Sequence, residues 1–381
     1  MIALSANVPT LRVLHVAPSH ARRDGGPSEV LRGILPALQE LGIHVELLST
    51  TKHLAVGEKA PEGITTHLAI SAGPASINYA RRFRSLLRGL VPKFDIVHIH
   101  SVHTFTTSTA MQVCARTGVP FVLQPHGAWD AYHLNEGRSK KQLYDRLFDA
   151  RNLRKAAGAI YSSTRESAAG RVFAPDIADN LVPLGVPDNL FSLPRDQADM
   201  NSVLFLGRVA KKKRLDLVLA AMATPAGRAN GFRLTVAGPL DEDMPEDPRA
   251  MARRLNLDHR VNFIGEVDAA ERTRQFLMAG VFVLPSDDES FGMSAAEALA
   301  AGVPTVTSAN VGIAPSAAAA GGLILVEQTA ESVATAIVNI VNNRAHGSRV
   351  AAAGRGYARD NFTWNAAAKA AVGAYERGIV R

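Results

Sequence analysis

The sequence has little cysteine, few aromatic residues and no long apolar run. Among its 381 residues there is one cysteine, Cys114, and 6% of the residues are aromatic. A single thiol excludes a disulfide framework within the chain, a Cys-x-x-Cys redox pair and a cysteine-based zinc cage. The longest apolar stretches, such as Phe276–Pro285, have about half the length of a membrane span. The first residues also lack the features of a signal peptide, and we therefore expect a cytoplasmic protein.

Motifs of several common enzyme classes are missing as well. The sequence contains no Walker A motif, no His-Glu-x-x-His and no Gly-x-Ser-x-Gly, which removes the simplest NTPase, metalloprotease and esterase interpretations. A dinucleotide-binding Gly-x-Gly-x-x-Gly follows neither Leu11–Pro18 nor Ser202–Gly207, the first strand-like segments of the two halves. A dehydrogenase is therefore not indicated.

Acidic residues are outnumbered, with 42 Lys and Arg against 35 Asp and Glu and a formal charge of +7. This balance favours anionic partners, which include nucleic acid, anionic lipid and nucleotide phosphates. The basic residues are spread over both halves without the interleaved aromatic residues that stack on bases. A basic nucleic-acid-binding protein is the alternative from another class, and we predict no nucleic acid partner.

Short β-branched runs alternate with longer helical patterns along the whole chain, which predicts parallel α/β sheets with right-handed crossovers. The proline-rich stretch Pro183–Asp199 has no periodicity and is interpreted as a linker. We predict two Rossmann-like, doubly wound domains, over residues 1–190 and 200–360, that face each other across a cleft. Residues 361–381 form the last segment. The Ala-rich tract Ser316–Gly322 is predicted to be a loop, and Ser139–Ala156 a basic helix.

The segment Pro285–Val306 is the strongest functional signal. Glu289 follows a strand, a turn of small residues spans Ser290–Gly292, and Glu297 lies inside a helix that stops at Gly302. The start of that helix offers free backbone N–H groups to a phosphate, and Glu297 is suited to bind ribose hydroxyls. Two solvated glutamates around an ordinary turn would show the same spacing.

Basic residues follow the first strand of the second half. Arg208 comes directly after that strand, and Lys213 lies five residues later, near the next helix. Both are suited to neutralise a diphosphate leaving group. Lys211 and Lys212 are interpreted as parts of a solvated basic turn.

The first half contributes weaker signals. Gly25 and Gly26 lie between a strand and a helix, where they permit close approach of a ligand to the backbone. His126 ends a strand, at a position from which a side chain can face the cleft. A lone histidine is more often structural, so neither feature identifies a site by itself.

The order of these elements resembles the retaining family 4 glycosyltransferases of the GT-B fold. The resemblance rests on Gly25-Gly26, His126-Gly127, Pro183–Val186, Gly207-Arg208 with Lys213, Ala237–Pro239 and Glu289–Glu297. It implies that Arg208 and Lys213 hold the donor diphosphate, that Glu297 holds the ribose, and that His126 lies beside the reacting carbon. It also implies that Glu289, with Gly238 and Ser290, Phe291, Gly292 and Met293, contacts the donor sugar and phosphates. The segment 361–381 is similar to the family's helix that crosses back to the first domain.

The expected activity is therefore transfer of a hexose, with retention, from a UDP- or GDP-sugar to an acceptor hydroxyl in polysaccharide assembly. The acceptor would be a saccharide or a lipid-linked saccharide, and no cofactor or metal is expected. A nucleotide-sugar 2-epimerase or a phosphorylase on a similar scaffold is the alternative. The run Asp241-Glu242-Asp243 resembles a metal-binding DxD but is interpreted as a solvated turn. Arg214 replaces the family's usual glycine and adds positive charge, and Leu184 and Pro187 also depart from the pattern.

A basic, amphipathic segment raises the question of membrane contact. On one helix, Tyr79, Phe83, Leu86, Leu87 and Leu90 would share a face opposite Arg81, Arg84 and Arg88. Such a helix can pack on the sheet, lie on an anionic leaflet, or do both. A peripheral position on the inner face of the membrane is therefore a hypothesis.

Overall fold

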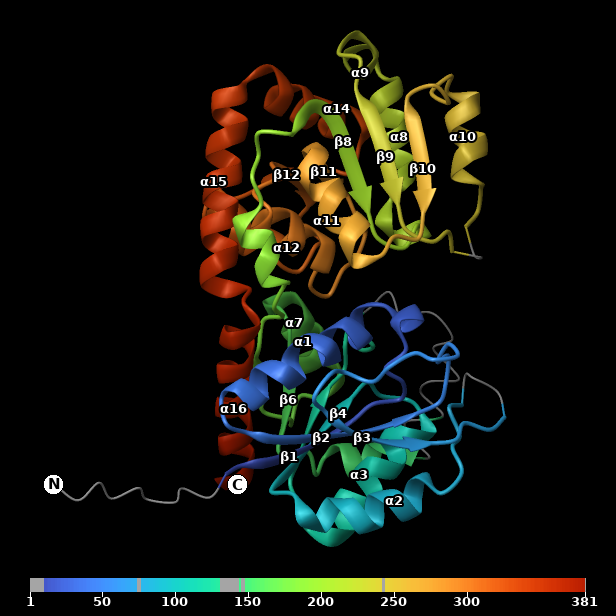
Figure 1. The fold of residues 1–381 in the computed structure, drawn as a ribbon, viewed down its shortest axis with the longest axis vertical. Helices are drawn as coiled ribbons and strands as arrows, with labels where there is room; N and C mark the ends of the chain where they lie inside the picture. Colours follow the sequence, from blue (N-terminus) through green and yellow to red (C-terminus); the bar gives the residue numbers. More distant parts are fainter. Residues whose placement is uncertain (1–9, 74–76, 131–143, 145–147, 242–243, 381) are drawn as a thin grey trace, which may run out of the picture. The chain divides into compact units, whose positions relative to one another are not determined.

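The structure is a computed structural model that describes residues 10–73, 77–130, 144, 148–241 and 244–380. The chain divides into two compact units, each with its own parallel sheet (Figure 1). Unit 1 comprises the chain up to Gly185 together with the residues from Trp364 on, and unit 2 comprises Val186–Thr363. The stretch predicted as an aperiodic linker contains a short 3-10 helix, η4 (Asp188–Ser192), and ends where strand β8 begins at Asp199.

The sheet of unit 1 has the strand order β3-β2-β1-β4-β5-β6-β7, and all adjacent strands are parallel. Its strands are β1 (Arg12–Val16), β2 (His44–Thr50), β3 (Thr65–Ala69), β4 (Ile96–His100), β5 (Phe121–Gln124), β6 (Gly158–Tyr161) and β7 (Asp179–Leu181). Its helices are η1 (Arg22–Asp24), α1 (Gly26–Glu40), α2 (Phe83–Leu90), η2 (Val91–Lys93), α3 (Phe105–Thr117), α6 (Ala150–Leu153), α7 (Thr164–Phe173) and α16 (Trp364–Val380). Most of the predicted helix Ser139–Ala156 lies outside the described residues.

The sheet of unit 2 has the order β10-β9-β8-β11-β12-β13 and is also parallel. Its strands are β8 (Asp199–Leu206), β9 (Arg233–Ala237), β10 (Val261–Gly265), β11 (Ala279–Leu284), β12 (Thr305–Ser308) and β13 (Ile324–Val326). Its remaining helices are η5 (Lys211–Lys213), α8 (Leu215–Ala223), α9 (Pro225–Ala229), α10 (Pro248–Arg254), α11 (Ala269–Met278), α12 (Met293–Ala300), α13 (Ala314–Ala319), α14 (Ala330–Asn342) and α15 (Arg344–Asn361). Two doubly wound domains are thus confirmed. The prediction of a loop at Ser316–Gly322 is wrong, because α13 occupies much of it.

Alternate residues of the central strands in unit 1 face different layers. Leu14 and Val16 of β1 share a buried cluster with Val97 and Ile99 of β4 and with apolar residues of α2 and α3. Since successive side chains of a strand point to opposite faces, the residues between them face the other layer. There α16 contacts β4, β5 and β6 and packs along α1. In Figure 1, α1 lies on one side of this sheet, and α2 and α3 lie on the other.

The amphipathic segment is shorter as a helix than predicted. Helix α2 begins at Phe83, and Arg82 before it has a left-handed conformation with φ of 60°. Arg81 and Tyr79 therefore precede the helix. Phe83, Leu87 and Leu90 are buried, and the Arg84 guanidinium donates a 3.0 Å hydrogen bond to Gln112 of α3. The apolar side packs into unit 1, and Arg84 contributes to that packing.

Within the described residues, no helix has the length and apolar character that a membrane-spanning segment requires.

Trp364 fixes the start of α16 against unit 1. The ring leaves so little space that a Cβ added at Gly33 of α1 would lie 2.0 Å from it. A Cβ at Gly185 would lie 2.4 Å from the same ring. Two glycines from distant parts of the sequence thus form the walls around one indole, and the close approach depends on their missing side chains.

We expect Gly33→Ala to lower the free energy of unfolding of unit 1 by at least about 1–3 kcal/mol, because the added methyl group overlaps the indole. Gly89→Ala in α2 is the matched control, since a Cβ there meets no atom within 4 Å in the portion of the chain that the structure describes. It should stabilise the helix by about 0.5–1 kcal/mol. Both tryptophans, Trp129 and Trp364, belong to unit 1, so fluorescence during urea unfolding reports this unit. Equal stability of the two variants would contradict the packing role.

Candidate functional site

The candidate site of unit 2 lies where the strand order reverses, between β8 and β11. Chains that leave the carboxyl ends of these strands diverge, which opens a crevice in doubly wound sheets. Arg208 follows β8 and is exposed, and Lys213 closes η5 a few residues later. Glu289 follows β11 and forms a bridge with Val311. The topology therefore brings the two predicted segments to the same edge.

An ion pair joins these segments. The Lys213 ammonium lies 3.0 Å from the Glu289 carboxylate, and the two side chains are 15% and 14% exposed, respectively. Beside this pair, the Nζ of Lys213 would be 3.1 Å from a Cβ at Gly207. The pair holds the lysine in a fixed place beside the end of β8. An anionic ligand there would either replace Glu289 as the partner of the lysine or bind the lysine together with Glu289.

The turn after Glu289 is held by a neighbouring loop. The Glu289 N–H donates to the Asn310 carbonyl at 3.1 Å, and the Ile313 N–H donates to the Phe291 carbonyl at 3.0 Å. Gly292 has φ of +97°, and a Cβ there would lie 2.3 Å from Val311. Glycine is therefore required at this position on two grounds, backbone conformation and space.

Helix α12 begins directly after this glycine, at Met293, and no side chain in the described part of the chain caps it. The first N–H groups of a helix have no partner within it and carry partial positive charge, which suits a phosphate. Ser290 and Met293 lie at this end. Phe291 is 4% exposed and its ring packs against Phe362, so it can offer a ligand only its backbone.

Glu297 has a partner that the sequence pattern did not indicate. Its side chain is buried on α12, and one carboxylate oxygen lies 3.0 Å from the Arg272 guanidinium of α11. Arg272 balances the charge of this buried carboxylate. A ribose bound by Glu297 would share the carboxylate with Arg272.

Gly238 has a packing role at the end of β9. Its φ is +136°, and a Cβ would lie 2.1 Å from the Gly207 carbonyl oxygen. The ends of β8 and β9 therefore touch through backbone alone. This contact sets the path of the chain that leads into Arg208.

Arg214 does not add free positive charge to the site, which corrects the expectation from sequence. It has a left-handed conformation (φ 56°), and its guanidinium bonds Asp216 and, at 2.9 Å, Asp287. These hydrogen bonds raise the pKa of Arg214 above its ordinary value, with the Asp216 bond as the largest cause. Of the DxD-like run, only Asp241 lies within the described residues.

In unit 1, Gly25 and Gly26 mark the start of α1 after β1. Gly25 has φ of +71° and precedes the helix, and Cβ atoms built at both glycines meet no atom of the described residues within 4 Å. The positive φ of residue 25 favours glycine there. At both positions the backbone remains open to a ligand.

His126 has an unusual backbone conformation that a buried carboxylate supports. Its φ is +54°, and the next N–H, that of Gly127, donates to Glu166 at 2.7 Å. The other Glu166 oxygen accepts from the N–H and hydroxyl of Ser162. Burial raises the pKa of Glu166 in spite of these bonds. Glu166 thus ties the His126-Gly127 turn to the start of α7.

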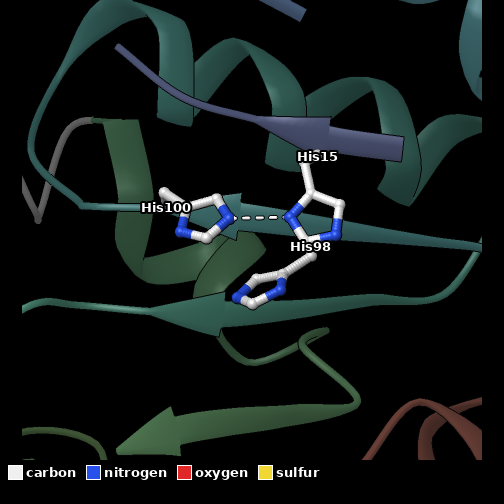
Figure 2. A group of neighbouring side chains, drawn as sticks. All are labelled: His15, His98 and His100. Carbon is white, nitrogen blue, oxygen red and sulfur yellow. Dashed lines mark hydrogen bonds between the residues drawn. The ribbon is translucent and has the colours of Figure 1, made fainter. Parts of the chain in front are cut away.

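His126 is joined through His100 to a cluster of three further histidines. Figure 2 shows His15, His98 and His100 together, with His15 and His100 joined by a hydrogen bond; the first belongs to β1 and the others to β4. His98 bonds the Tyr375 hydroxyl of α16 at 2.8 Å, and His100 bonds His126 at 3.0 Å. Burial lowers the pKa of the first three well below the usual value and lowers that of His126 to about 4.

Two family models match the chain, one for each part. The glycosyl transferase 4-like domain matches residues 25–185, and the glycosyl transferases group 1 model matches residues 193–357. The chain belongs to the family 4 glycosyltransferases of the GT-B fold. This confirms the resemblance that the sequence motifs indicated.

Similar sequences among characterised proteins are also glycosyltransferases. The GDP-mannose:cellobiosyl-diphosphopolyprenol alpha-mannosyltransferase of Komagataeibacter xylinus is 24% identical, over 78% of this chain and 76% of that protein. The D-inositol 3-phosphate glycosyltransferase of Frankia alni is 28% identical, over 75% of each chain.

Solved structures share the fold of this glycosyltransferase. Anabaena Alr3699/HepE, solved with UDP and glucose, superposes with a TM-score of 0.76 at 16% identity and covers 96% of this chain and 99% of that one. Sucrose-phosphate synthase from Thermosynechococcus elongatus gives a TM-score of 0.74 at 21% identity, over 96% and 98% of the two chains.

The histidines of the glycosyltransferase generate a stability prediction. Their folded pKa values are lowered, so below about pH 6.5 the unfolded chain binds protons that unit 1 does not. The free energy of unfolding should therefore fall as pH decreases from 7.5 to 5.5, by up to about 1.4 kcal/mol per pH unit for each histidine. Tryptophan fluorescence during urea unfolding at several pH values measures the slope.

In this experiment, His15→Gln should reduce the slope by about one proton, which is about 1.4 kcal/mol per pH unit. The exposed His259→Gln in unit 2 is the control and should leave it unchanged. An unaltered slope in His15→Gln would show that His15 does not resist protonation.

Proposed function

We propose that this glycosyltransferase transfers a hexose from a UDP- or GDP-sugar to an acceptor hydroxyl, with retention and without a metal ion, in the assembly of a cell-surface or secreted polysaccharide. The observation that carries the proposal is the Lys213–Glu289 pair, 3.0 Å apart, next to the uncapped start of α12. Cationic side chains and oriented N–H groups are suited to the charge that a diphosphate acquires as it leaves.

In the proposed reaction, the bond between the sugar's anomeric carbon and the diphosphate oxygen breaks, and an acceptor oxygen bonds to that carbon from the same face. The proton of the acceptor hydroxyl passes to the departing diphosphate oxygen. Arg208, Lys213 and the amides at Ser290–Met293 stabilise the departing diphosphate, and Glu289 contacts the sugar. Glu297, backed by Arg272, holds the ribose. His126 is the proposed contribution of unit 1 beside the reacting carbon, and Gly25 and Gly26 leave room for a ligand at the backbone.

The characterised relatives favour transfer over the alternative activities. The mannosyltransferase and the inositol phosphate glycosyltransferase both use an acceptor by name. A 2-epimerase consumes none, so consumption of an acceptor distinguishes the two. The polysaccharide role is supported by the relative that acts on a polyprenol-linked saccharide.

We expect the wild type to release nucleoside diphosphate from UDP-glucose or GDP-mannose in the presence of EDTA. Arg208→Ala and Lys213→Ala should each slow this release by on the order of 10²–10³, because each removes a group aimed at charge that develops in the transition state. Glu297→Gln should mainly raise the KM for the donor. Steady-state assays with a panel of UDP-, GDP- and ADP-sugars measure these effects.

Lys211→Ala is the matched control, because Lys211 belongs to the same basic turn but is exposed. Its rate should equal that of the wild type. An absolute requirement for Mg²⁺ or Mn²⁺, together with metal binding that Asp241→Ala abolishes, would replace the proposal with a metal-dependent one.

We also propose that the segment before and within α2 contacts an anionic membrane surface, as a lipid-linked acceptor would favour. Arg81 and Arg88 are exposed, whereas Arg84 is engaged by Gln112. The double variant Arg81→Glu, Arg88→Glu should weaken the affinity for anionic vesicles at low salt by about 30-fold or more. Sedimentation with the vesicles measures this affinity. Arg344→Glu with Arg349→Glu on α15 is the charge-matched control. Failure of the wild type to bind such vesicles would favour a soluble acceptor.

A further inference from the structure

A row of hydrogen-bonded imidazoles runs from the core of unit 1 to His126. His15 Nδ1 lies 2.9 Å from His100 Nε2, and His100 Nδ1 lies 3.0 Å from His126 Nε2. The ring planes are tilted by only 24° and 14°, which suits bonds between in-plane nitrogens. We call His15, His100 and His126 the histidine row.

The two hydrogen bonds of the row run in the same donor-to-acceptor direction. A neutral imidazole has one N–H and one acceptor nitrogen, and His100 bonds an imidazole at each of its nitrogens. It therefore donates to one neighbour and accepts from the other. Consequently the tautomer of His15 determines that of His100, which in turn determines that of His126.

The inner end of the row selects the direction. His15 is fully buried, and its Nε2 has no hydrogen-bond partner among the described residues. A buried N–H without an acceptor is rarer in proteins than an under-satisfied acceptor, and leaving it unpaired costs stability. The proton of His15 is therefore on Nδ1, where His100 accepts it. His100 then donates from Nδ1 to His126 Nε2, and His126 carries its own proton on Nδ1.

On the basis of the function proposed above, we propose that His100, supported by His15, is a positioning residue that holds His126 as the neutral Nδ1–H tautomer. In this form His126 presents a hydrogen-bond donor to the sugar nucleotide at Nδ1. It does not act as a proton relay, because the row ends at the buried Nε2 of His15. The role of His126 is thus to orient and stabilise rather than to remove a proton.

A metal ion is the competing explanation for this cluster. Nitrogens of His15, His98 and His100 all lie within 4.8 Å of one another. However, the His98 and His100 rings stack, with centroids 4.1 Å apart and planes 21° apart, so their lone pairs do not converge on one point as zinc ligands must. One nitrogen of His15 and both nitrogens of His100 are also occupied by hydrogen bonds. The geometry favours the row.

The test compares His100→Asn with His100→Gln in the full-length chain. An asparagine amide reaches approximately the position of Nδ1 and can still donate to His126, whereas a glutamine amide reaches that of Nε2 and contacts only His15. Histidine ring ¹⁵N spectra report the protonated nitrogen, and His126→Gln assigns the signal. We expect Nδ1–H at His126 in the wild type and in His100→Asn, and a mixture of tautomers in His100→Gln.

The same variants should differ in turnover. His100→Gln should lower kcat by up to about tenfold, the value of one neutral hydrogen bond, with little change in KM, and His100→Asn should recover most of it. If His100→Gln does not fold, His100→Leu, which leaves no donor to His126 Nε2, should also give mixed tautomers at His126.

Three results would overturn the proposal. They are protonation of His126 at Nε2 in the wild type, an unchanged tautomer in both His100→Gln and His100→Leu, and stoichiometric binding of Zn²⁺ that displaces the hydrogen bonds of the row. Absence of transferase activity in a wild type with the expected ¹⁵N spectrum would instead refute the proposed function alone.

Discussion

Parallel pairing of the strands is the constraint on which the candidate sites depend. Because every strand of a sheet points the same way, all carboxyl ends meet at one edge. Arg208, Glu289 and His126 are far from one another in sequence, yet each follows a strand. If neighbouring strands were antiparallel, the residues that follow them would lie at opposite edges of the sheet, whatever their chemistry.

The two units use different electrostatics at these edges. Unit 2 places charged groups in pairs, with Lys213 against Glu289 and Arg272 against Glu297. The basic member of each pair can attract an anionic ligand, and its acidic partner stabilises it before the ligand binds. Unit 1 instead buries imidazoles whose neutral form is favoured and links them through hydrogen bonds. The first arrangement suits a leaving group that gains charge, and the second suits fixed orientation of a neutral group.

The sequence predicted the alternation of strands and helices, the two parallel α/β domains and the local motifs, because these depend on short-range patterns. Strand β3 escaped prediction because it is an edge strand with only one buried residue among five. Arg272 and Glu166 escaped because their partners are distant in sequence. Ser163 and Glu166 do show the spacing of a capping box, but this spacing predicts a helix start at α7 and carries no information about Gly127. The pattern His-x-His on a buried strand was the one local sign of the imidazole cluster.

The placement of α16 has a consequence for the order in which the chain acquires structure during synthesis. Unit 2 is one continuous stretch, Val186–Thr363, and emerges from the ribosome complete. Unit 1 needs Trp364 between Gly33 and Gly185, and Tyr375 against His98. The part of the first sheet's face that α16 covers, over β4, β5 and β6, therefore stays exposed until this helix has been translated. The part of the protein that is made first is thus the part that finishes folding last.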